Sequence, residues 1–187
     1  QKSQRLKTLT EDVVEASKVS SGNITLEFMN LNLNELVQQV NGEFAERFEG
    51  RNLDLICILQ PEPLLIRADS RRIWRVLENL YVNVCKYAMP GTRVYVDAIK
   101  KDGKIQLSIK NISENPLNFQ ADELTERFIR GDVSRSTEGS GLGLSIAKNL
   151  TVLQHGSFNI YLDGDLFKVT ITFDEAVKEK KPMPPMI

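Results

Sequence analysis

Residues 139–150 read Gly139-Ser-Gly-Leu-Gly-Leu-Ser-Ile-Ala-Lys-Asn-Leu150, with three glycines at alternate positions that lead directly into a helical pattern. Glycine allows a backbone to approach a ligand closely. The first turn of the following helix offers unpaired N–H groups and the positive end of the helix dipole. The stretch therefore predicts a phosphate-binding turn. Because glycine motifs recur by chance, a flexible turn before an ordinary helix remains the alternative for this stretch taken alone.

Composition indicates a soluble globular protein of one compact domain with an appendage. The chain has 187 residues, 41% of them hydrophobic, and a formal net charge of −1. A charge this close to zero gives no basic field for nucleic acid, so no nucleic-acid partner is expected. No apolar run is long enough to cross a membrane, and no signal peptide is visible. Cys57 and Cys85 lie in apolar segments and are expected to be buried, reduced thiols of a cytosolic protein.

The first 20 residues predict a helix with a heptad seam. The seam residues are Leu6, Leu9, Val13, Ala16 and Ser20. One helix cannot bury such a stripe within itself, so we expect a partner helix or a second chain to cover it. A helix lying on the following domain is the alternative. Because the chain opens with Gln1 rather than Met, we also expect it to derive from a longer protein.

The remaining pattern predicts strands and helices of an α+β fold. The expected strands are 24–28, 53–59, 64–66, 93–99, 104–110, 157–162 and 166–173, and the expected helices are 32–49, 69–88 and a third from 144. Residues 113–139 are polar and are expected to form a long functional loop. The order predicts a two-layer α/β sandwich, in which about three helices cover one face of a mixed, mostly antiparallel sheet, preceded by one long stalk helix.

A second group of polar residues lies on the helix expected over 69–88. Asn79, Asn83 and Lys86 are spaced at i, i+4 and i+7, which places them on one helix face. Such a face is usually only solvated. However, two asparagines cost helix stability, an amide oxygen is a hard ligand that suits Mg²⁺, and lysine can meet phosphate as a point charge. The group therefore favours a phosphate and metal site.

Three motifs together resemble those of sensor histidine kinases. Residues Asn79–Tyr87 resemble the asparagine box, Glu126–Arg130 the phenylalanine box, and Gly139–Ala147 the second glycine box. The resemblance implies a catalytic ATP-binding domain of the ATPase superfamily shared with gyrase and Hsp90, over residues 23–174. It also implies that residues 1–22 are part of the second helix of a dimerisation hairpin. Residues 175–187 are expected to be a disordered tail.

The resemblance implies that the cofactors are ATP and Mg²⁺. It assigns the metal to Asn83 and the phosphates to Asn79 and Lys86, with Tyr87 lining the nucleotide. Arg130 would meet the γ-phosphate, so that Asn79, Lys86 and Arg130 form the expected catalytic set. Phe128 would anchor a mobile lid over the nucleotide, although a plain core role is equally open for it. The glycine-box residues expected around the phosphates are Gly139, Ser140, Gly141, Leu142 and Gly143.

One box departs from the family pattern. The family's first glycine box reads Asp-x-Gly-x-Gly, and its Asp accepts from the adenine amino group, whereas this chain has Asn111-Ile-Ser113-Glu-Asn115. Asn111 still offers an acceptor for adenine, and we expect Asn115 to replace a glycine in a left-handed conformation. A simple turn role for Asn111 at the strand end is the alternative.

The chain contains a single histidine, His155, outside the family's acceptor motif, and it is expected to be structural, with Gly156 as the helix C-terminal cap. The resemblance implies transfer of the γ-phosphoryl group of ATP to a His on an absent upstream helix, then to an Asp of a response regulator receiver domain. It further implies a homodimer through the stalk helix and the cytoplasmic part of a membrane-anchored bacterial sensor. A degenerate nucleotide-binding module without turnover and an ATP-hydrolysing clamp are the alternatives.

Overall fold

The structure is a computed structural model that describes residues 24–117 and 142–177 and five positions nearer the N-terminus. Those five, Thr10, Val13, Val14, Ser17 and Lys18, are helical. Val13, which belongs to the predicted seam, is exposed. None of the helices in these described parts is long and apolar enough to span a bilayer.

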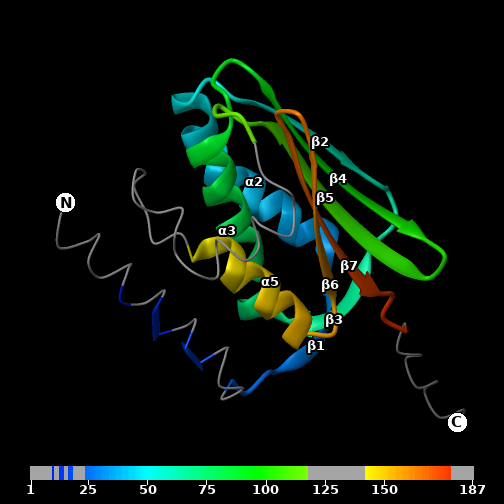
Figure 1. Ribbon diagram of the computed structural model, residues 1–187. Coiled ribbons are helices and arrows are strands. Elements are labelled where there is room, and N and C mark those ends of the chain that lie inside the picture. Colours follow the sequence, from blue (N-terminus) through cyan, green and yellow to red (C-terminus); the bar gives the residue numbers. More distant parts are fainter. Residues whose placement is uncertain (1–9, 11–12, 15–16, 19–23, 118–141, 178–187) are drawn as a thin grey trace, which may run out of the picture.

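A five-stranded sheet forms one layer of the domain (Figure 1). Its strands, in spatial order, are β2 (Asp54–Leu59), β4 (Arg93–Lys101), β5 (Lys104–Ile112), β7 (Leu166–Asp174) and β6 (Ser157–Asp163). β2 runs parallel to β4, and every other neighbouring pair is antiparallel. A separate small sheet pairs β1 (Phe28–Asn32) with β3 (Leu65–Asp69).

Three helices form the second layer and cover one face of the large sheet: α2 (Leu33–Gly50), α3 (Ser70–Tyr87) and α5 (Gly143–Leu153) (Figure 1). The first two begin within one residue of their expected starts, 32 and 69, and each has a capping side chain. The side chain of Asn32 accepts from the Asn34 amide, and the side chain of Asp69 accepts from the amides of Arg71 and Arg72. Capping of this kind satisfies N–H groups that have no partner inside the helix. The predicted α+β sandwich is confirmed.

The core lies between the helices and the inner face of the sheet. On β5, the alternate residues Ile105, Leu107 and Ile109 are buried, and Asn111 continues the same row. Successive side chains of a strand point to opposite faces, so Asn111 is a polar residue on a face that is otherwise apolar along this strand. This position directs its side chain towards the helices.

Several local expectations were wrong. The first strand is Phe28–Asn32 rather than 24–28, because the pairing with β3 runs from Phe28 opposite Asp69 to Asn32 opposite Leu65. Cys57 is exposed rather than buried, because it lies on the edge strand β2, and Cys85 is only half-buried. The part of Cys57 that neighbouring residues cover raises the pKa of its thiol through desolvation.

The expected C-terminal cap also differs. The left-handed residue after α5 is His155, with φ 63°, and not Gly156. The amides of His155 and Gly156 donate to the carbonyls of Val152 and Thr151, which forms a Schellman motif. Gly156 is instead required by close packing, because a methyl group there would lie 2.6 Å from Cε1 of Phe173.

Candidate functional site

The asparagine face of α3 turns partly into the domain. Asn79 is buried, Asn83 and Tyr87 are half-buried, and Lys86 is exposed. The side-chain amide of Asn79 donates to the carbonyl oxygen of Arg75 at 2.9 Å, one turn earlier in the same helix. This bond fixes the direction of the side chain. The Asn79 Oδ1 atom is therefore held in one position, against the neighbouring helix α5.

The first residue of α5 lies directly against Asn79. A methyl group added to Gly143 would be 3.1 Å from Asn79 Oδ1 and 3.8 Å from Asn79 Cγ. Only a residue without a side chain allows this approach without displacing the amide. The contact brings the predicted asparagine box and the last glycine of the predicted glycine box together, although 64 positions separate them in the sequence.

The start of α5 differs from the starts of α2 and α3. Its N-cap residue is Leu142, and no side chain caps the helix. The Ser145 hydroxyl donates to the Leu142 carbonyl at 2.8 Å and does not accept from a first-turn amide there. First-turn N–H groups carry the positive end of the helix dipole, so an anion can take the place that a capping side chain occupies in the other two helices.

Asn111 has an unused buried acceptor. Its residue is 3% exposed, its side-chain amide donates to the Ile112 carbonyl at 3.2 Å, and its Oδ1 atom has no hydrogen-bond partner among the described residues. A buried acceptor without a partner costs roughly 1–3 kcal/mol. In a binding site, a ligand donor removes that cost. The atom is therefore suited to accept from an amino group such as that of adenine.

The residues after Asn111 run beside the C-terminal end of α3. Ser113 forms an isolated bridge with Ala88, and the Glu114 amide donates to the Tyr87 carbonyl at 2.7 Å. Arg51 reinforces this junction, because its guanidinium donates to the Ala88 carbonyl at 3.1 Å and pairs with Glu114 at 3.0 Å. The strand that carries Asn111 and the helix that carries Asn83 and Tyr87 are thus held together at one end.

The glycines of the family pattern are not replaced as expected. Ser113 is buried in the bridge with Ala88, where its backbone amide donates to the Asp165 carbonyl at 2.7 Å. Asn115 is not among the described residues with a positive φ, so the prediction of a left-handed Asn115 was wrong. Ser113 is accommodated because the chain continues here as extended, paired backbone, which imposes no glycine-specific conformation.

Five predicted site residues lie outside the described parts of the chain: Phe128, Arg130, Gly139, Ser140 and Gly141. Most of the predicted lid, residues 113–139, lies there as well. The described members, Asn79, Asn83, Lys86, Tyr87, Asn111, Leu142 and Gly143, come from α3, the end of β5 and the start of α5.

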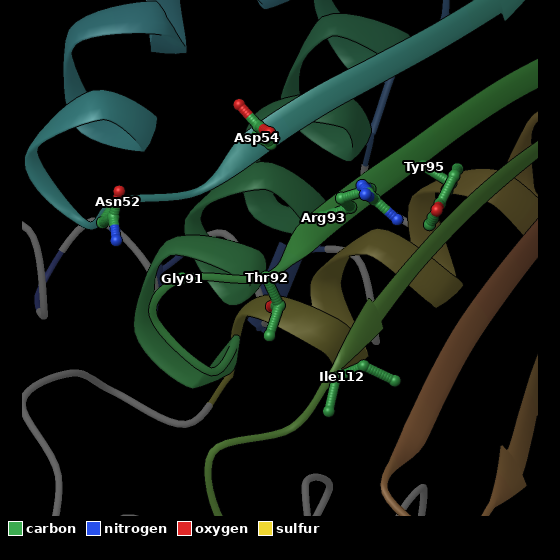
Figure 2. Close-up of a pocket in the computed structure, with 7 residues that line it drawn as sticks. All are labelled: Asn52, Asp54, Gly91, Thr92, Arg93, Tyr95 and Ile112. Atoms are coloured by element: carbon green, nitrogen blue, oxygen red, sulfur yellow. The ribbon is translucent and has the colours of Figure 1, made fainter.

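A hollow of about 610 Å³ lies elsewhere on the molecule (Figure 2). It is lined by Asn52, Asp54, Gly91, Thr92, Arg93, Tyr95 and Ile112. Arg93 and Tyr95 alternate along β4 with the buried Val94 and Val96, so they project from the face of the sheet that the helices leave uncovered. None of the lining residues is a predicted site residue, although Ile112 directly follows Asn111 on β5.

Comparison with known proteins assigns the chain to a family. Residues 68–177 match the model of the histidine kinase-, DNA gyrase B- and HSP90-like ATPases. The chain is 30% identical over 161 residues to the sensor protein VanSC of Enterococcus gallinarum, which covers 85% of this chain and 44% of VanSC. The chain thus spans less than half the length of that relative.

Solved structures agree with this assignment. The catalytic domain of histidine kinase ThkA superposes with a TM-score of 0.69 at 26% identity, over 80% of this chain and 96% of that domain. ThkA in complex with response regulator protein TrrA superposes with a TM-score of 0.73 at 25% identity, over 96% of this chain and 50% of that one. The chain belongs to the histidine kinase-, DNA gyrase B- and HSP90-like ATPase family, and its ATP-binding domain is of the sensor histidine kinase type.

Proposed function

We propose that this chain positions ATP and Mg²⁺ for transfer of the γ-phosphoryl group to a histidine on a helix outside these 187 residues. The observation that carries the proposal is the buried, unpartnered Oδ1 atom of Asn111, which lies on the strand joined to the end of α3. Adenine offers an amino group as the donor that this atom lacks. Asn111 is thus the proposed adenine-binding residue.

The phosphates are proposed to lie between α3 and the start of α5. Asn79 Oδ1 lies beside Gly143, and the first turn of α5 has no side-chain cap. Lys86 would supply a positive charge from the same helix as Asn79. Arg130 and residues 139–141, which lie outside the described parts, are proposed from the motif pattern to complete the phosphate site.

Mg²⁺ is proposed to bind through Asn83. The described residues contain no cluster of three His, Cys, Asp or Glu side chains suited to a metal. Mg²⁺ in a nucleotide site does not need one, because one or two protein oxygens, phosphate oxygens and water complete its octahedron. The half-buried amide of Asn83, one turn from Asn79, fits that role. The metal would neutralise charge on the β- and γ-phosphates.

Phosphoryl transfer to a protein, rather than ATP hydrolysis, is the proposed outcome. A hydrolase of the gyrase or Hsp90 type uses a glutamate at the position of Asn79 to activate water. Asn79 is an amide that already donates to Arg75, and the adjacent Glu78 is ion-paired with Arg75 at 2.7 Å. Neither residue is placed as a base. The receiver domain of a response regulator is the proposed next acceptor, as suggested by the ThkA–TrrA complex.

We further propose that residues 1–22 take part in a homodimer, because Val13 and Val14 are exposed on a helical segment. Apolar side chains on one helix are stabilised by a second helix that covers them. In the parent protein, the chain is proposed to be the cytoplasmic part of a membrane-anchored bacterial sensor.

Calorimetric titration of ATP, with and without Mg²⁺, tests the nucleotide site. Asn111→Leu removes the unpartnered acceptor at nearly constant volume. We expect thermal stability to be retained or raised and ATP affinity to fall about 10-fold, since the variant loses the hydrogen bond to adenine. The control is Asn159→Leu on the opposite face of the sheet, which should leave affinity unchanged. Unchanged ATP affinity in Asn111→Leu would contradict the adenine assignment.

A further inference from the structure

Asp69 connects three segments of the chain. Its Oδ1 atom accepts from the amides of Arg71 and Arg72 and caps α3. Its Oδ2 atom accepts from the Glu27 amide at 2.8 Å, in the segment that leads into β1. Its own amide donates to Oε1 of Gln154 at 2.9 Å, beyond the C-terminal end of α5. One buried aspartate thus joins the start of α3, the end of α5 and the entry to the domain.

Gln154 completes this connection from the side of α5. The residue is 1% exposed, and its side-chain amide donates to the Leu150 carbonyl at 2.9 Å, one turn earlier. Both polar atoms of the side chain are therefore satisfied, one within α5 and one by Asp69. Beside it, His155 stacks on Phe28 with ring centroids 5.6 Å apart. The end of α5 thus contacts both the α3 cap and the first strand.

These contacts lie at the opposite end of the α3–α5 pair from the proposed phosphate site. Gly143 contacts Asn79 near the start of α5, whereas Gln154 contacts Asp69 just after its end, so the two helices are antiparallel neighbours (Figure 1). Eleven residues of α5 correspond to about 16 Å. The pair is therefore fixed at two points, one at the proposed phosphate site and one at the domain entry.

We propose that Asp69 and Gln154 are positioning residues that couple nucleotide binding to the docking of residues 24–27. A small shift of α5 along α3 changes the Asn79–Gly143 contact at one end and the Asp69–Gln154 contact at the other. Packed helices transmit such a shift because close-packed interiors do not deform continuously. The Glu27 amide reports this shift, since it is bonded to the same carboxylate. The inference rests on the proposed nucleotide site.

Coupling of this kind acts equally in both directions. If nucleotide binding favours the docked state of residues 24–27, releasing those residues must weaken nucleotide binding by the same factor. A signal that arrives through the segment before β1 would then change the affinity for ATP without any contact with the nucleotide. A purely structural role for Asp69 and Gln154 predicts no such reciprocity.

Hydrogen exchange of the Glu27 amide, measured by NMR on the whole chain with and without saturating ATP and Mg²⁺, tests the proposal. We expect nucleotide to slow this exchange about 5-fold in the unmodified protein. In Gln154→Met, which keeps the volume and removes both hydrogen bonds, nucleotide should still bind but change the exchange less than about 2-fold. Thr151→Val is the matched control, because it loses only a hydroxyl bonded within α5 and should behave like the unmodified protein.

A second variant tests reciprocity. Asp69→Asn keeps one side-chain oxygen for the α3 cap and replaces the acceptor for Glu27 by an amide donor. The Glu27 amide should then exchange rapidly with or without nucleotide, and ATP affinity measured by calorimetry should fall about 5-fold. The coupling alone is overturned by either of two results. One is an unchanged ATP affinity in Asp69→Asn, and the other is a Glu27 amide exchange rate that is the same with and without ATP in the unmodified protein. Absence of any ATP binding to the unmodified protein overturns the proposed function as well.

Discussion

The side-chain oxygen of Asn79 lies against Gly143, since a methyl group added to Gly143 would be 3.1 Å from Asn79 Oδ1. The start of α5 and the middle of α3 therefore approach each other as closely as a glycine permits. The side-chain amide of Asn79 cannot rotate away from Gly143 without losing its hydrogen bond to the Arg75 carbonyl. The geometry of the proposed phosphate site therefore depends on the absence of one side chain.

Gly143→Ala should weaken ATP binding about 10-fold and leave the fold intact, since the new methyl group displaces the Asn79 amide while alanine adds up to about 1 kcal/mol of helix preference. Calorimetry and thermal unfolding measure the two effects. Gly42→Ala in α2 is the matched control, because a methyl group there meets nothing within 4 Å. It should raise stability and leave ATP affinity unchanged. Equal ATP affinity in both variants would refute the steric argument.

Asn83→Ala should weaken ATP binding in the presence of Mg²⁺ more than in its absence, because the substitution removes one oxygen ligand of the proposed metal site. A loss of about 10-fold with Mg²⁺ and less than about 3-fold without it is expected from one ligand or hydrogen bond. Titrations with ATP and with ATP–Mg²⁺ give the comparison directly. If affinity falls by the same factor in both, Asn83 does not hold the metal.

The stability of the domain should depend on pH through Asp69. Burial raises the pKa of this carboxyl, but hydrogen bonds from the amides of Glu27, Arg72 and Arg71, with the positive charge of Arg72, lower it below its ordinary value. A depressed pKa in the folded state means that the carboxylate stabilises the fold above the unfolded pKa. This contribution is lost as the pH falls through the folded pKa.

Asp69→Asn should therefore be less stable than the unmodified protein at pH 7, by about 1–2 kcal/mol for a lost charge–dipole interaction and hydrogen bond. The difference should shrink as the pH falls from the unfolded pKa of aspartate through the lowered folded pKa of Asp69, because the folded protein then loses this charge as well. Urea unfolding at a series of pH values between 3 and 7 measures it. A difference that stays constant over this range would show that the charge of Asp69 contributes nothing.

Local signals predicted much of the architecture. Helices were expected over 32–49 and 69–88, and α2 and α3 begin directly after their caps Asn32 and Asp69. The buried residues of α3 include Ile73, Leu77, Leu80 and Val84, and they recur at the helical spacing from which that helix was predicted. Both features arise within a few residues, so a single sequence contains them. The first strand was misplaced, because its position depends on pairing with β3 about 40 residues later.

The contacts that define the site are long-range and were not predicted in detail. The asparagine and glycine motifs indicated phosphate chemistry separately, but the Asn79–Gly143 contact depends on how two helices pack. Nothing in the local sequence indicated that Gln154 is buried, since a glutamine at a helix end is usually exposed. Its burial is accompanied by the hydrogen bond from the amide of Asp69, which lies 85 residues earlier in the chain.

His155 should not accept a phosphoryl group, although it is the single histidine of the chain. It follows α5 with φ 63° and stacks on Phe28, whereas the proposed phosphate site lies at the other end of that helix, about 16 Å away at the α-helical rise. In-line transfer needs donor and acceptor within bonding reach.

The 187 residues should therefore bind γ-labelled ATP and remain unlabelled. Extension by an upstream helix that carries a histidine should produce acid-labile label, and His155→Asn should not reduce it, because asparagine tolerates a positive φ. Acid-labile phosphate on His155 itself would show that the acceptor lies within this chain.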